Sequence, residues 1–152
     1  MTLYFVDRQR IESILTYMTE QFELLKTKKS WDSKLEQLAL ERLIHVTIES
    51  FLDIGNQVID GFIMRDPGSY EDIVDILVDE KVVPKGNHEA FKLLVQQRKG
   101  LVQYYDQVDI AALLTLMETH LEAWSHFPHQ VRQFLQQELG PVSAFKPENE
   151  TD

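Results

Sequence analysis

The chain has 152 residues, of which 43% are hydrophobic, and carries a formal net charge of −10 at pH 7. A chain of this length forms one domain that buries about two-thirds of its unfolded surface around a single core. The absence of cysteine excludes disulfides, thiolate metal sites and a cysteine nucleophile, and fits a reducing, cytoplasmic setting.

The net charge also limits the partners. Non-specific binding to nucleic-acid backbones depends on Lys and Arg releasing counterions from phosphates, so we expect no DNA partner and expect any RNA partner to use a local site. No stretch approaches the roughly 20 apolar residues that span a bilayer. Charged residues also interrupt the N-terminus before a signal-peptide hydrophobic run develops. We therefore expect no membrane partner.

Two amphipathic helices are predicted in the first part of the chain. Apolar residues recur at steps of three and four after Asp7, which predicts a helix that ends near the basic residues at 26–29. Ser33 and Glu36 form a capping box, and the helical pattern that follows them continues to about Asp60.

Turn residues divide the middle of the chain into two further helices. Gly100 lies inside the second of these and weakens it by roughly 1 kcal/mol relative to Ala, so we expect a bend there. The predicted segments are a turn at 65–68, a short helix over 69–83, a break at 84–86 and a helix over about 88–105.

The C-terminal part begins at Asp109, the predicted N-cap of a fifth helix over about 110–124. Pro128 separates this helix from a shorter piece that stops at Gly140. Residues 142–152 are predicted to be an acidic, disordered tail, so that residues 1–141 form the domain. Because no alternating strand pattern and no repeat appear and the connections are short, we predict an all-α antiparallel bundle of about five helices.

Common catalytic motifs are missing. The sequence has no GxxxxGK[ST] loop, no GxGxxG and no HExxH, and we expect no cofactor. A divalent ion shared by Asp72, Asp75 and Asp79 is less favoured than a solvated acidic face. His120, His126 and His129 lack the spacing of metal ligands. We therefore expect no metal site and interpret these histidines as surface residues.

A cation, several amides and two phenols gather at residues 97–106. This segment resembles the signature of the HepT-like family of the HEPN superfamily, in which an Arg is followed after four residues by a His and, one residue later, by a Tyr. Arg98 matches the Arg and Tyr105 the Tyr, whereas Gln103 stands at the His position.

Three other segments carry the same resemblance. Residues 48–56, Ile-Glu-Ser-Phe-Leu-Asp-Ile-Gly-Asn, are similar to the family's I-E-x-x-x-D-I-G segment. Residues 67–70 are similar to its P-x-S-Y turn, and Val108-Asp109 to its V-D cap. Because these segments agree in order and spacing, the resemblance covers the chain to about Leu139.

The resemblance implies a HEPN-like, dimer-forming bundle and a ribonuclease toxin. Such toxins are paired with a minimal nucleotidyltransferase antitoxin that attaches AMP to the motif tyrosine, here Tyr105. It also implies a cleft that contains Arg98, Gln103 and Tyr105, with Asp53, Asn56 and Tyr104 lining it. The seven-residue spacing from Arg98 to Tyr105 is close to two helical turns, which places both on one face of a continuous helix.

Gln103 is the departure that decides the expected activity. Cleavage of RNA without a metal needs a cation for the phosphate, which Arg98 supplies, and a group that moves the 2′-hydroxyl proton. A side-chain amide does not titrate near neutral pH, so we predict weak or lost cleavage. Recruitment of His45 or His88 is a less favoured rescue, because nothing in the sequence places either ring near Arg98.

Two functions therefore stay open. One is a HepT-like ribonuclease toxin, a metal-independent endoribonuclease if it is active. The other is a non-catalytic dimeric HEPN module that binds a nucleotide, an RNA end or a protein partner. His45 is favoured as a satisfied core or interface residue. For Asp53 and Asn56 the sequence favours neither a cleft role nor a structural one at a helix crossing.

Overall fold

The computed structural model describes residues 6–140 of the chain. These residues form seven α-helices and two short 3-10 helices, with no strand in that range, so the predicted all-α fold is confirmed. The elements are α1 (Arg8–Thr27), α2 (Lys34–Gly61), α3 (Tyr70–Asp79), η1 (Lys85–Asn87), α4 (His88–Gln96), α5 (Arg98–Val102), η2 (Tyr105–Gln107), α6 (Ile110–Ser125) and α7 (Phe127–Leu139).

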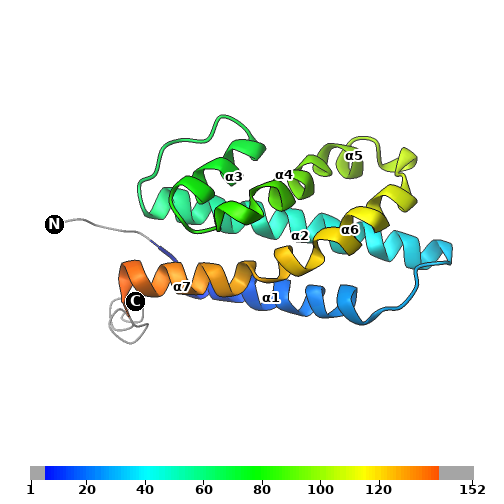
Figure 1. The fold of residues 1–152 in the computed structure, drawn as a ribbon, viewed down its shortest axis with the longest axis horizontal. Coiled ribbons are helices and arrows are strands. Elements are labelled where there is room, and N and C mark those ends of the chain that lie inside the picture. Colours follow the sequence, from blue (N-terminus) through cyan, green and yellow to red (C-terminus); the bar gives the residue numbers. More distant parts are fainter. Residues whose placement is uncertain (1–5, 141–152) are drawn as a thin grey trace.

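The long helix α2 is the spine of the bundle (Figure 1). It packs against α1 on one side and against α3 and α5 on the other, while α6 and α7 follow one another along α1. In Figure 1, α2 runs from right to left, whereas α4 and α5 run from left to right. The chain segment α4–α5 is therefore antiparallel to α2, and α5 lies beside the N-terminal half of that helix.

The helix starts were predicted correctly because their caps are local. The side chains of Asp7, Ser33, Ser69 and Asp109 each accept a hydrogen bond from the backbone N–H three residues later. At Ser33 the reciprocal bond from the Ser33 N–H to the Glu36 carboxylate completes the capping box, with an N–O distance of 2.9 Å.

The predicted end of the helix that starts at Ser69 was wrong. The helix over 69–83 ends at Asp79, because Lys81 adopts a φ of 64° and the N–H groups of Val82 and Val83 both bond to the Leu77 carbonyl. Val82 and Val83 are nevertheless buried outside the helix.

The helix predicted over 88–105 is divided at Gln97 and not bent at Gly100. The Gln97 N–H bonds to the Leu94 carbonyl, three residues back, which tightens the last turn of α4. Gly100 lies within α5, with open space around the position of a side chain. The division makes Arg98 the first residue of α5.

Aromatic side chains hold the centre of the core. Phe51 stacks on Phe91 with ring centroids 4.7 Å apart, and Phe127 lies 4.7 Å from Phe51. Trp124 is fully buried, and its indole N–H donates to the Ala90 carbonyl at 2.8 Å. These contacts fix α2, α4, α6 and α7 relative to one another.

Gly55 leaves room for Ile73 where α3 packs on α2. A Cβ atom at that position would come within 2.6 Å of the Ile73 Cγ2 methyl, so only glycine leaves room. Within residues 6–140 no helix has both the length and the apolar character needed to span a bilayer. The predicted tail at 142–152 lies outside the described residues.

Candidate functional site

Arg98 is the centre of a small polar network between three helices. Its Nε atom donates to Oε2 of Glu49 on α2 at 2.6 Å, and its Nη2 atom lies 3.4 Å from Oε1 of the same carboxylate. This hydrogen bond raises the pKa of Arg98 above its ordinary value. Because the Arg98 side chain is still 27% exposed, the site combines a fixed cation with access from solvent.

The Tyr70 ring packs against the same guanidinium. The Arg98 Cζ atom lies 4.6 Å from the centre of the Tyr70 ring, a cation–π distance. Tyr70 is the first residue of α3, which Gly55 allows to approach α2 closely. Among the described residues, Nη1 of Arg98 has no hydrogen-bond partner, so this nitrogen retains its capacity to donate to an anion.

The α2 face beneath Arg98 carries four polar residues. His45, Glu49, Asp53 and Asn56 are spaced four, four and three residues apart, which aligns them along one side of the helix. The His45 Nε2 atom lies 3.9 Å from the Glu49 Oε2 atom. Asp53 and Asn56 are exposed, and in the described part of the chain Arg98 bonds to Glu49 and to neither of them.

The other motif residues follow the end of α5. Gln103 caps that helix, and its N–H donates to the Lys99 carbonyl at 2.8 Å while its side chain is exposed. Tyr104 is 51% exposed and Tyr105 is 70% exposed. In residues 6–140 no hydrogen bond joins the side chain of Gln103 or Tyr105 to Arg98.

The spacing argument for Arg98 and Tyr105 fails in this structure. It assumed a continuous helix of two turns, but α5 ends at Val102 and Tyr105 begins the 3-10 helix η2. The chain turn between the two elements, rather than a shared helical face, sets where the tyrosine lies.

The acidic face of α3 is paired with cations. Asp72 forms a two-pronged bond with Arg65, at 2.8 and 3.0 Å. Asp75 accepts from His88 at 2.6 Å and lies 3.3 Å from the Lys92 ammonium, and the His88 bond lowers its pKa. His88 is thereby engaged between α3 and α4. No group of three His, Asp or Glu residues in the described ranges has the arrangement of a metal site.

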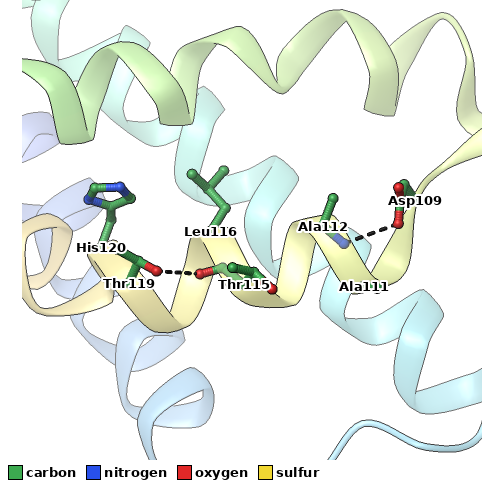
Figure 2. Close-up of a pocket in the computed structure, with 7 residues that line it drawn as sticks. All are labelled: Asp109, Ala111, Ala112, Thr115, Leu116, Thr119 and His120. Carbon is green, nitrogen blue, oxygen red and sulfur yellow. Dashed lines mark hydrogen bonds between the residues drawn. The ribbon is translucent and has the colours of Figure 1, made fainter.

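A separate hollow of about 530 Å³ runs along α6 (Figure 2). His120 lies at one end of it and Asp109 at the other, where the Asp109 carboxylate caps α6 through the Ala112 N–H at 3.0 Å. Between them the lining is small, apolar or hydroxylic, with no cation for a phosphate. This hollow therefore lacks a Lys or Arg that would bind a phosphate.

Sequence reasoning missed two residues of the network, Glu49 and Tyr70. Both lie in segments that were recognised, the I-E-x-x-x-D-I-G stretch and the P-x-S-Y turn, but only Asp53 and Asn56 were assigned to the cleft. The available signal was Glu49 itself. It is an acidic residue in a recognised helical segment, and an acidic residue is the natural partner of the motif arginine. Chemically, the network offers an oriented guanidinium for a phosphate and no titratable group at position 103.

Comparisons with known proteins show the family of the chain. The family model described as "Ribonuclease HepT-like" matches residues 9–131. A protein of Bacillus subtilis (strain 168) named "Putative RNase YutE" is 50% identical over 144 residues, which cover 95% of this chain and all of that protein. The solved structure of YutE, described as a cytosolic protein of unknown function, gives a TM-score of 0.90 over 94% of this chain and 100% of that one.

A more distant solved structure shares the fold. It is a tri-AMPylated Shewanella oneidensis HEPN toxin in complex with its MNT antitoxin. The TM-score is 0.68 at 15% identity, and the match covers 82% of this chain and 95% of that one. At this level of identity the likeness concerns the fold alone.

Proposed function

Because this chain belongs to the HepT-like ribonuclease family, we propose that it is the ribonuclease toxin of a toxin–antitoxin pair and cleaves RNA slowly without a metal. The observation that supports this most is the Arg98 guanidinium, which Glu49 and Tyr70 orient while its Nη1 atom has no hydrogen-bond partner among the described residues. A pre-oriented cation of this kind suits a phosphate that gains charge in the transition state.

The proposed reaction is an attack of the RNA 2′-hydroxyl on the adjacent phosphate. Arg98 binds the non-bridging oxygens and stabilises the pentacoordinate phosphorus, for which a guanidinium is well shaped. Glu49 keeps the guanidinium in place and takes no part in the proton transfer. Gln103 contributes no proton transfer, and general acid–base help is typically worth about 10²–10⁴ in rate, so the wild-type rate is low.

The proposed partners follow from the family. A nucleotidyltransferase antitoxin attaches AMP to Tyr105, whose side chain is 70% exposed and therefore accessible to a modifying enzyme. The active form is a cytoplasmic homodimer in which two copies of the Arg98 site face one cleft, lined also by Asp53, Asn56 and Tyr104.

A second candidate function is supported by Gln103. If the motif has lost proton transfer completely, the same oriented Arg98 retains its affinity for a phosphate and the protein acts as a non-catalytic dimeric module. Its ligand would be a nucleotide, an RNA end or a protein partner.

The test is RNA cleavage in the presence of EDTA by the wild-type protein, Arg98→Ala and Lys99→Ala. Lys99 is the matched control, since it is an exposed cation beside Arg98 that makes no side-chain bond in the described structure. We expect slow cleavage that Arg98→Ala abolishes and Lys99→Ala retains. Cleavage at equal rates by all three proteins, or by none, would count against the ribonuclease and favour the binding module.

A further inference from the structure

The Glu49 carboxylate joins the motif arginine to a histidine outside the motif. Oε2 of Glu49 accepts the Arg98 Nε hydrogen at 2.6 Å, and the same oxygen lies 3.9 Å from Nε2 of His45. The imidazole and the guanidinium thus lie next to one carboxylate oxygen. We propose that His45 accepts the 2′-hydroxyl proton, the role of the motif histidine whose position Gln103 occupies. This proposal rests on the proposed ribonuclease function.

The direction of the helices places His45 on the correct side of Arg98. Helix α5 packs antiparallel to α2, so moving forward along α5 from Arg98 corresponds to moving backward along α2 from Glu49. His45 is four residues before Glu49, just over one turn or about 6 Å along the α2 axis. It therefore lies on the side of Arg98 toward which α5 runs, the side of Gln103.

The His45 ring is available to a substrate. Its side chain is 28% exposed, and at 3.9 Å its contact with Glu49 is too long for a hydrogen bond. Glu49 is its one ion-pair neighbour among the described residues, so neither ring nitrogen is committed. His88, the other histidine considered for this role, is instead bound to Asp75 at 2.6 Å.

In the proposed reaction one nucleotide contacts both Arg98 and His45. The 2′-oxygen and the 3′-phosphate belong to the same ribose and are separated by a few bonds, so the proposal places the phosphate on Arg98 and the 2′-hydroxyl of the same nucleotide beside His45. The neutral imidazole takes the 2′-hydroxyl proton as the 2′-oxygen bonds to phosphorus and the bond from phosphorus to the 5′-oxygen breaks. The 5′-oxygen takes a proton from water, and the imidazolium returns its proton to solvent. The products are a 2′,3′-cyclic phosphate and a 5′-hydroxyl.

The test compares single-turnover cleavage of end-labelled RNA in EDTA by the wild-type protein, His45→Ala, Arg98→Ala and His126→Gln. His126 is the matched control, since its Nε2 atom lies 3.8 Å from Oε2 of Glu122, a similar histidine–glutamate pair four residues apart that holds no arginine in the described structure. We expect His45→Ala to lose at least about 10-fold in rate and His126→Gln to lose nothing. Added imidazole should restore part of the rate to His45→Ala and none to Arg98→Ala.

The outcomes distinguish the role of His45 from the proposed ribonuclease function on which it rests. Arg98-dependent cleavage that His45→Ala leaves at the wild-type rate overturns the role of His45 and retains the ribonuclease. A loss in His45→Ala that imidazole does not restore also overturns it, because a merely structural defect behaves in that way. Absence of Arg98-dependent cleavage in the wild-type protein overturns both.

Discussion

Replacing Gln103 with His returns a titratable ring to the motif position that lacks one. The structure indicates that the position tolerates the change. The Gln103 side chain is exposed and makes no hydrogen bond in the described structure, and its backbone is helical at φ −100° and ψ −35°. The bond from its N–H to the Lys99 carbonyl does not involve the side chain. We expect a change in stability within about 0.5 kcal/mol.

The expected gain in cleavage rate follows from the same geometry. General acid–base catalysis by a well-placed side chain is typically worth about 10²–10⁴. An exposed residue at the end of a five-residue helix is less fixed than a packed one, so we expect a gain near the lower end, about 10²-fold over the wild-type rate.

The assay follows cleavage of a labelled RNA in EDTA by the wild-type protein, Gln103→His and the double variant Gln103→His with Arg98→Ala. Gln103→Asn is the control that changes the side chain without adding a proton carrier. The gain should appear in Gln103→His alone and vanish in the double variant. If Gln103→His folds normally and cleaves no faster than Gln103→Asn, then position 103 does not face the scissile bond. The assignment of Gln103 to the catalytic His position of the family would then be wrong.

Three further predictions concern the fold that supports the site. Gly55→Ala places a methyl group 2.6 Å from Ile73 Cγ2; overpacking of about 1–3 kcal/mol outweighs a helix-propensity gain of about 1 kcal/mol, so urea unfolding should show a net loss, and an unchanged midpoint would mean that α3 moves freely. Trp124→Phe removes the buried bond to the Ala90 carbonyl and should lower the free energy of unfolding by about 1–3 kcal/mol, whereas a neutral result would show that water replaces it. Hydrogen bonds from Lys28 and from the Ser33 backbone lower the pKa of Glu36 from 4.5 to about 2. A carboxyl group with a lowered pKa stabilises the fold at pH values above its ordinary pKa, and this contribution is lost as the pH falls toward the lowered pKa. The melting-temperature difference between wild type and Glu36→Gln should therefore be present at neutral pH and disappear between pH 4.5 and about 2. A difference that does not vary with pH would contradict the lowered pKa.

The sequence was most informative where structure is set locally. Asp7, Ser33, Ser69 and Asp109 start helices through bonds to residues three positions away, and a helix start was predicted at each of these places. Helix ends were less predictable. Val82 and Val83 continue an apolar pattern but are buried by the turn at Lys81 rather than by a helix.

The site shows the same division between local and tertiary information. Arg98, Gln103 and Tyr105 are close in sequence and were identified from their resemblance to the family signature. Glu49 and Tyr70 reach Arg98 only because α3 and α5 pack on α2. Glu49 and Arg98 are 49 positions apart in the sequence, and no local pattern between them reveals this bond. The same packing places His45 and the Arg98 guanidinium beside one carboxylate, that of Glu49.

The ends of the cleaved RNA test the central claim, attack by the 2′-hydroxyl with Arg98 on the phosphate, most directly. The measurement is mass spectrometry of the fragments that the wild-type protein and Arg98→Ala release from a defined RNA in EDTA, with the same RNA carrying 2′-O-methyl groups as the control. We predict 2′,3′-cyclic phosphate and 5′-hydroxyl ends that depend on Arg98, and no cleavage of the methylated RNA. Fragments with 3′-hydroxyl and 5′-phosphate ends, or cleavage of the methylated RNA, would contradict the account.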